Sequence, residues 1–184
     1  MGKLKEQTDA KIAAGRKANP DFMQGVDDII AQAKEFEQGK HAIKVGEKAP
    51  GFELPNAEGT SVSLTTLVEK GPVVVAFYRG SWCPYCNLQL RALQARLNEI
   101  HELGAALVAI SPEVPDGSLT KSEISTLDFT VLSDQDAKVA AQYGIFWEVQ
   151  EFLIEHMCVD RSFDLEKINN GNGCVLPITT TFVL

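Results

Sequence analysis

The sequence lacks any apolar run long enough to cross a membrane, and it lacks an excess of positive charge. The apolar run from Val73 to Tyr78 is far shorter than the roughly 18 residues that a membrane-spanning helix needs. Lys and Arg number 17 against 25 Asp and Glu, so the net charge is −8, and the basic residues form no cluster. Nucleic acids and anionic membranes attract basic clusters, so we expect neither as a partner.

The first residues, Met1 to Thr8, contain neither an apolar core nor a small-residue cleavage site. We therefore expect no secretory signal and predict a cytoplasmic location. Structural disulfides are rare in the cytoplasm. The four cysteines of the chain consequently indicate chemistry or packing rather than a disulfide scaffold.

The composition of residues 1–43 predicts a helical N-terminal extension, followed by a single domain at 44–184. Apolar residues recur at helical spacing up to Phe36, and Asn19 followed by Pro20 is typical of a helix start. Such a helix either covers the core of its own chain or makes a dimer contact. A homodimer therefore remains open.

The domain has the pattern of an α/β fold with parallel strands and helices on both faces. Continuous β-branched and aromatic runs predict buried strands, because such runs suit strands that are covered on both sides. The expected strands are 73–78, 105–110, 129–132 and 179–184. The other expected elements are a hairpin around the turn 56–59, helical segments at 65–69, 84–104, 118–127 and 138–143, and an irregular insertion at 145–170 with some helix.

The strand expected at 179–184 runs to the end of the sequence without a turn, a polar tail or a final helix behind it. Native domains rarely stop on an apolar run. We therefore expect that this sequence is a fragment, truncated at its C-terminus.

The most informative segment is the C-x-x-C motif of Cys83 and Cys86, which follows a buried strand and begins a helix. Pro84 suits the first helical turn, so free backbone N–H groups and the helix dipole favour the thiolate of Cys83. Arg79, four residues upstream, adds positive potential. Cys86 lies nearly one turn later, within disulfide reach. We therefore predict that Cys83 is an exposed attacking thiol and Cys86 the resolving thiol.

Two other interpretations of the motif are half of a zinc site and a pair of buried structural cysteines. A zinc ribbon needs a second close pair, whereas Cys158 and Cys174 are 16 residues apart, and no histidine has finger spacing. A redox pair is therefore favoured, with no metal and no other cofactor. We expect Cys158 to be packed, Cys174 to be exposed in a Gly/Asn-rich loop and His156 to lie on the surface. Trp82 either shields the site from water or only packs.

Four segments carry a resemblance to a known family: Val45–Pro55, Phe77–Cys86, Val108–Pro112 and Val131–Asp134. They resemble the alkyl hydroperoxide reductase and thiol-specific antioxidant family, in its peroxiredoxin-like branch with a C-x-x-C motif. The resemblance implies a thioredoxin-like fold, in which a central mixed sheet is flanked by helices and the last strand lies beside 73–78. It also implies that Cys83 is the peroxidatic cysteine.

Family members carry the pattern P-x-x-x-T-x-x-C at the peroxidatic cysteine and an Arg just before the last strand. In this sequence the corresponding positions are Ala76, Gly80 and Thr179. Thr179 and Trp82 are therefore supporting candidates only, and Arg79 is a candidate for the missing cation.

These observations leave two enzymatic functions open. A thiol peroxidase would reduce hydrogen peroxide or organic hydroperoxides through Cys83 and form a disulfide with Cys86, which a thioredoxin-like or glutathione-type donor would reduce. A thiol–disulfide oxidoreductase would use the same pair on protein disulfides, and the absent Thr and Arg favour it. A redox sensor without turnover is a third class. The family resemblance favours the peroxidase.

Overall fold

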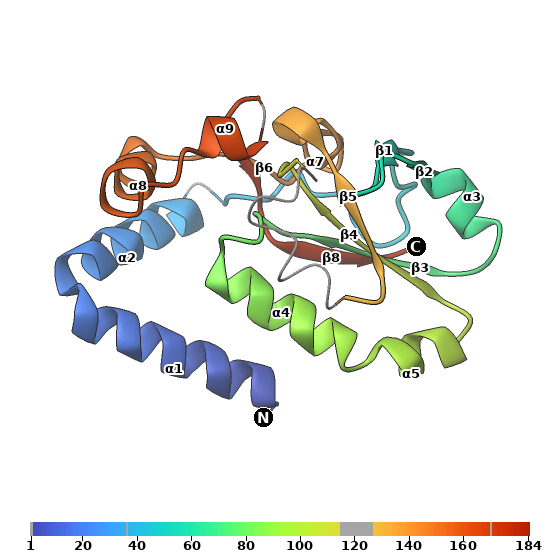
Figure 1. Cartoon of the computed structure of the whole chain (residues 1–184), viewed down its shortest axis with the longest axis horizontal. Coiled ribbons are helices and arrows are strands. Elements are labelled where there is room, and N and C mark those ends of the chain that lie inside the picture. Colours follow the sequence, from blue (N-terminus) through green and yellow to red (C-terminus); the bar gives the residue numbers. More distant parts are fainter. Residues whose placement is uncertain (1, 36, 115–126, 170) are drawn as a thin grey trace.

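A mixed four-stranded sheet lies at the centre of the chain, whose computed structural model describes residues 2–35, 37–114, 127–169 and 171–184. Figure 1 shows helices on both sides of this sheet. Within the described ranges no helix is both long and apolar enough to span a bilayer.

The central sheet has the strand order β5-β4-β3-β8. Three strands are parallel, β3 (Val73–Phe77), β4 (Ala106–Ser111) and β5 (Thr130–Ser133), and β8 (Thr180–Val183) runs antiparallel to β3. All four strands that the sequence predicts for the sheet are present, and the last one lies beside β3 as expected. The sheet is therefore mixed.

The sheet separates two apolar clusters, because side chains alternate between the faces of a strand. On one face, Val75 and Phe77 of β3 pack with Tyr143. On the other face, Leu107 and Ala109 of β4 belong to a cluster that also contains the cysteine pair. We call this second set the cysteine cluster; its buried members are Tyr78, Cys83, Cys86, Leu90, Leu97, Leu107, Ala109 and Phe129.

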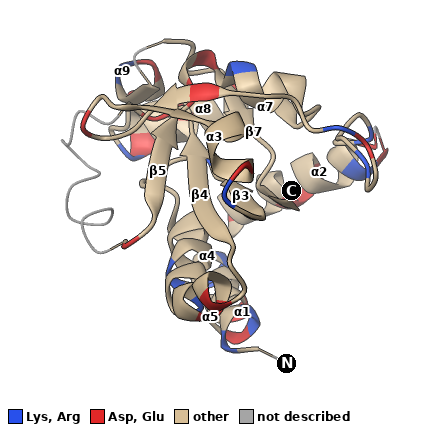
Figure 2. Cartoon of the chain, turned by 90° about the vertical axis from the view of Figure 1, so that its right-hand side faces the viewer, with Lys and Arg blue, Asp and Glu red and all other residues tan. Residues whose placement is uncertain are grey.

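Helices α4 (Pro84–Gln94) and α5 (Leu97–Glu102) cover the cysteine cluster on one side of the sheet, as Figures 1 and 2 show. The prediction of one helix over 84–104 is wrong, because the backbone of Arg96 leaves the helical region at φ −109° and ψ 5°. The break allows Leu97 to enter the core, where it is 4% exposed.

The hairpin and two short helices that the sequence predicts lie on the opposite side of the sheet. The hairpin consists of β1 (Glu53–Pro55) and β2 (Ser61–Ser63), and the helices are α3 (Leu64–Val68) and α7 (Lys138–Gln142). Of the helix expected at 118–127, residues 118–126 lie outside the described residues, and Phe36 also lies outside them.

The segment after α7 is more regular than the sequence indicates. Strands β6 (Phe146–Glu148) and β7 (Val175–Pro177) pair antiparallel with each other. Between them lie α8 (Glu151–Glu155), a π-helical turn (His156–Asp160) and α9 (Leu165–Asn169). The helices that the sequence predicts in this insertion are therefore present, but strand β6 at its start was not predicted.

The N-terminal residues form two helices, α1 (Lys3–Ala18) and α2 (Pro20–Glu35). The side chain of Asn19 accepts a hydrogen bond from the N–H of Phe22 at 3.1 Å, so Asn19 caps α2 as the sequence predicts. Figure 1 shows α1 running along the outer side of α4, which it contacts.

Helix α2 packs against its own chain through Phe22, whose ring stacks on Phe152 and His156 with centroid distances of 5.5 Å and 3.7 Å. The expectation that His156 lies on the surface is wrong, because this stacking leaves its side chain only 14% exposed. The boundary between an extension at 1–43 and a domain at 44–184 stays a prediction, as does a dimer contact through the extension.

Candidate active site

The connection from β3 to α4 carries the cysteine pair. Cys83 is the N-cap residue of α4 with an extended backbone, and Pro84 is the first residue of the helix. Gly80 has φ +152°, a conformation that favours glycine. The N–H of Cys83 donates to the carbonyl of Gly80 at 3.1 Å, which closes the turn in front of the helix.

Both cysteines of the motif are free thiols and are buried, with exposures of 4% for Cys83 and 2% for Cys86. The expectation of an exposed attacking thiol is therefore wrong. The loop folds inward, and Cys83 belongs to the cysteine cluster instead of facing solvent.

The two thiols form a hydrogen-bonded pair. The S–H of Cys86 donates to the sulfur of Cys83, and this contact lowers the pKa of Cys83 although burial acts in the opposite direction. The backbone N–H groups of Cys86 and Tyr85 at the helix start, together with the charge of Arg79, lower the pKa further. These contacts therefore favour the thiolate of Cys83 over that of Cys86.

The same contact raises the pKa of Cys86. Ionising Cys86 would remove the proton that it donates to Cys83, and burial adds to this effect. A second negative charge beside the first would also be unfavourable. The pair therefore holds one nucleophilic thiolate and one protonated thiol in contact.

A buried carboxylate, Glu113, holds the loop that carries Cys83. Its oxygens accept hydrogen bonds from the N–H of Ser81 at 2.6 Å and from the hydroxyl of Ser81 at 2.8 Å. The carbonyl of Ser81 in turn accepts from the side chain of Asn87 in α4 at 2.7 Å. The loop is thus fastened both to the end of β4 and to α4.

Sequence reasoning missed Glu113 as part of the site. Glu113 lies 32 residues from Ser81, so no local spacing connects them. The one signal was its position directly after the predicted strand 105–110. The carboxyl ends of parallel neighbouring strands meet at one edge of a sheet, and β3 and β4 are such neighbours.

The structure brings Arg79 and Trp82 to the cysteine pair. The guanidinium of Arg79 lies 4.9 Å from the centroid of the Trp147 ring, and its charge acts on both sulfurs. Trp82 packs against the cysteine cluster. Thr179 reaches the same edge of the sheet, because the next residue pairs with Phe77 at the end of β3, but its side chain is exposed.

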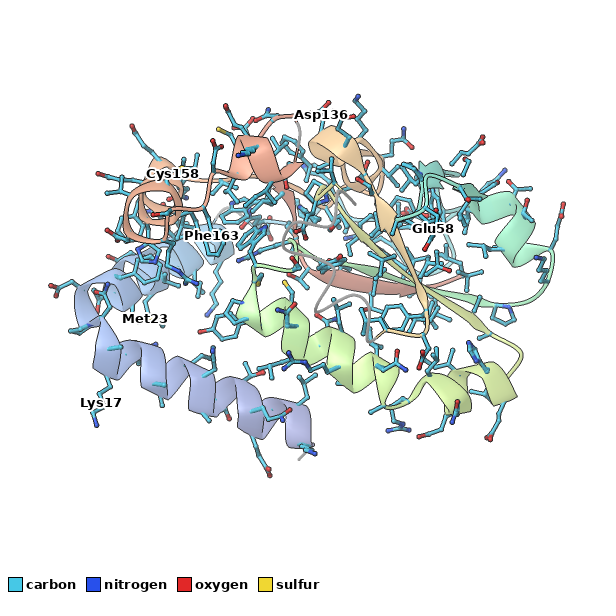
Figure 3. All side chains as sticks on the ribbon, viewed as in Figure 1. Lys17, Met23, Glu58, Asp136, Cys158 and Phe163 are labelled. Atoms are coloured by element: carbon cyan, nitrogen blue, oxygen red, sulfur yellow. The ribbon has the colours of Figure 1, made fainter. Side chains whose placement is uncertain are left out.

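The other two cysteines, Cys158 and Cys174, are free and exposed. The expectation that Cys158 is packed is wrong, because it is His156 of the same π-helical turn that contacts Phe22. Figure 3 shows Cys158 on the helical segment next to α2. Over the described ranges, no three His, Cys, Asp or Glu side chains gather as metal ligands.

Comparison with protein families gives one match, in which the AhpC/TSA family covers residues 45–180. Peroxiredoxin Bcp of Escherichia coli is 34% identical over 111 residues, which cover 60% of this chain and 70% of that protein. The putative peroxiredoxin bcp of Haemophilus influenzae is 35% identical over 144 residues, covering 76% of this chain and 88% of its own.

Solved structures of peroxiredoxins share the architecture. Peroxidoxin BcpB from Mycobacterium tuberculosis has a TM-score of 0.59 and 28% identity, and the match covers 77% of this chain and 79% of that one. A mutant of peroxiredoxin Q from Xanthomonas campestris has a TM-score of 0.54, with 72% and 73% coverage. At 17% identity, the second similarity shows the fold alone.

Proposed function

The chain belongs to the AhpC/TSA family, and on this basis we propose that it is a thiol-dependent peroxidase in which Cys83 attacks the peroxide and Cys86 resolves the product. It is an enzyme of the peroxiredoxin type with a thioredoxin-like fold. The observation that carries the assignment of roles is the hydrogen bond from the Cys86 thiol to the Cys83 sulfur, with the opposite pKa shifts that it causes.

The first step is the oxidation of Cys83. Its thiolate attacks one peroxide oxygen, an S–O bond forms and the O–O bond breaks. The products are the sulfenic acid of Cys83 and an alkoxide or hydroxide, which takes a proton from water. Sulfur loses two electrons and the peroxide gains them.

The second step closes the disulfide. The sulfur of Cys86 attacks the sulfenic sulfur, the S–O bond breaks, and the proton of Cys86 leaves with the hydroxyl as water. A protonated Cys86 suits the first step, because Cys86 then does not compete for the peroxide as a thiolate. Once Cys83 is a sulfenic acid, the negative charge that opposes ionisation of Cys86 is gone, which favours the second step.

A thiol reductant must then reduce the disulfide. Family members use thioredoxin-type reductants, and we propose a thioredoxin-like donor here, since a dithiol can release its own mixed disulfide in a second exchange. A glutathione-type donor is the alternative. The cytoplasmic location and the homodimer also remain predictions.

The experiment compares the peroxidase with a thiol–disulfide oxidoreductase, which Gly80 and Thr179 at the family's Thr and Arg positions favour. Reduced protein receives one equivalent of hydrogen peroxide, and peroxide and free thiols are counted over time. A peroxidase consumes one peroxide for each pair of thiols lost. Rapid reduction of insulin disulfides, with peroxide left unconsumed, would instead identify the oxidoreductase.

A further inference from the structure

Gly80, in the turn that precedes Cys83, leaves a space that the indole of Trp82 fills. A Cβ built on Gly80 would lie 2.3 Å from Nε1 of Trp82 and 2.7 Å from its Cδ1. No side chain at position 80 can therefore coexist with this indole. The indole N–H takes the place that a side chain of residue 80 would occupy.

The indole nitrogen is buried, and Nε1 of Trp82 has no hydrogen-bond partner among the described residues. The same holds for Nε of Arg79, three residues earlier in the same loop. A buried N–H without a partner loses the free energy of its hydration, so native structures rarely keep one without a reason. Two such donors lie in the loop that leads to Cys83, and the charge of Arg79 acts on the Cys83 sulfur. Their position indicates groups that are held for a ligand.

The chemistry of the proposed function supplies that ligand. When the Cys83 thiolate attacks a peroxide, negative charge develops on the oxygen that leaves. That oxygen needs hydrogen-bond donors in a site from which water is largely excluded. Cys83 is 4% exposed, and Trp82 packs on the same cluster.

We propose that the indole N–H of Trp82 donates a hydrogen bond to the bound peroxide and to the oxygen that leaves, with the Arg79 guanidinium as the accompanying cation. This inference rests on the proposed peroxidase function. The indole keeps its proton throughout, so the leaving oxygen still takes its proton from water. Glycine at position 80 is then what admits the donor from position 82.

The test replaces the indole with a ring of similar shape that has no N–H, in the variant Trp82→Phe. We expect its second-order rate constant with hydrogen peroxide to fall by about tenfold or more, the usual range for the loss of one donor to a developing oxyanion. Alkylation of Cys83 by iodoacetamide at the same pH should be unchanged, because iodide is a poor hydrogen-bond acceptor.

The matched control is Tyr143→Phe, which also removes one polar group from an aromatic side chain. The hydroxyl of Tyr143 donates to the carbonyl of Pro50 at 2.9 Å, and Tyr143 packs on the other face of the sheet. Its rate with peroxide should stay at the level of the unmodified chain. An equal loss in both variants would mean that the effect is general destabilisation, which overturns the proposal.

Two further outcomes overturn the role of Trp82. They are a Trp82→Phe protein that reacts with peroxide at the full rate, and one whose alkylation slows as much as its oxidation. An unmodified chain whose Cys83 does not react with peroxide contradicts the proposed function itself and is recognised before any variant is made.

A second measurement does not depend on the folding of Trp82→Phe. In Cys83→Ser, which lacks the attacking sulfur, the indole N–H resonance of Trp82 is followed by NMR while hydrogen peroxide is added. Comparison with Trp147→Phe in the same background assigns the two indole signals. We expect the Trp82 signal to shift in a saturable manner, and a signal that does not move overturns the proposal.

Discussion

The chain holds two cysteine-bearing regions that differ in burial and in how firmly their backbone is held. Cys83 and Cys86 are buried in one cluster, and hydrogen bonds from Glu113 and Asn87 fasten the loop before them. Cys158 and Cys174 are exposed, the first on a π-helical turn and the second before β7.

With Cys83 as the proposed attacking thiol, solvent exposure is a poor guide to the reactive thiol in this chain. A sulfur becomes a nucleophile when donors and positive charge stabilise its thiolate, and Cys83 has the donor of Cys86, the start of α4 and Arg79. Burial does not prevent a sulfur from having such neighbours, and exposure alone does not supply them.

The largest expected effect is on peroxide consumption, and it compares the two cysteine-bearing regions directly. Cys83→Ser should abolish consumption of peroxide, because a hydroxyl at this position does not ionise near neutral pH. Cys158→Ser and Cys174→Ser should each retain the full rate. Steady-state peroxide consumption with an excess of reductant measures all three variants. Persistent turnover in Cys83→Ser would transfer the attacking role to another thiol.

The next prediction concerns Cys86 and pH. Cys86→Ala removes the donor to Cys83, so the pKa of Cys83 should rise, and its thiolate fraction at a given pH should fall. Cys86→Ser keeps an O–H donor and should raise the pKa less. Iodoacetamide alkylation rates between pH 5 and 9, roughly the range around the usual thiol pKa, measure both changes.

Both Cys86 variants should also stop after one turnover, because no thiol remains next to the sulfenic acid. The sulfenic acid should then be trapped by dimedone in one equivalent per chain. Cys174→Ala is the control and should alter neither the pH profile nor the turnover. A Cys86→Ser protein with normal steady-state turnover would show that another thiol resolves the sulfenic acid.

A smaller effect is expected from Glu113→Gln. The amide offers one acceptor oxygen where the carboxylate offers two to Ser81, so at least one buried donor is left unpaired. The loss should cost about 1–3 kcal/mol of stability and lower the melting temperature by several degrees. The oxidation of Cys83 should slow as well, because its loop is held less firmly. The exposed Glu58→Gln is the control, and equal melting curves would contradict the structural role of Glu113.

The smallest effect should come from Phe22→Ala, which removes the stacking on Phe152 and His156. The loss of these aromatic contacts should cost about 1 kcal/mol and should speed the alkylation of Cys158, because its helical turn no longer rests on α2. Peroxide consumption through Cys83 should not change. A drop in peroxidase rate would show that α2 supports the cysteine pair as well.

The sequence predicted the elements with a strong local signal. The β-branched runs of β3 and β4 and the C-x-x-C motif at the start of α4 are such elements, because burial on both faces and a proline at the first helical turn leave clear patterns. Strands β6 and β7 were not predicted. These two strands pair with each other across a long separation in the sequence, whereas the equally short β1 and β2 flank a turn that marks them as a hairpin.

The candidate site was predictable in its cysteines and not in their surroundings. The loop before Cys83 is held by a carboxylate that follows a different strand, and the donor role proposed for Trp82 depends on the missing side chain of Gly80. Both contacts form only when the chain folds, so a sequence pattern does not show them. A lowered pKa of Cys83 was predictable from its place at the helix start. The largest cause, the hydrogen bond between the two thiols, was not predicted.

The placement of both sulfurs at the first turn of a single helix has a kinetic consequence. The proposed closure of the disulfide is a reaction within one chain, with no second segment or second molecule to bring in. Its rate should therefore be first order and independent of protein concentration, and the reacting groups have the high effective molarity of a preorganised pair. Dilution would slow the meeting with peroxide and with the reductant, and it would leave the lifetime of the sulfenic acid unchanged.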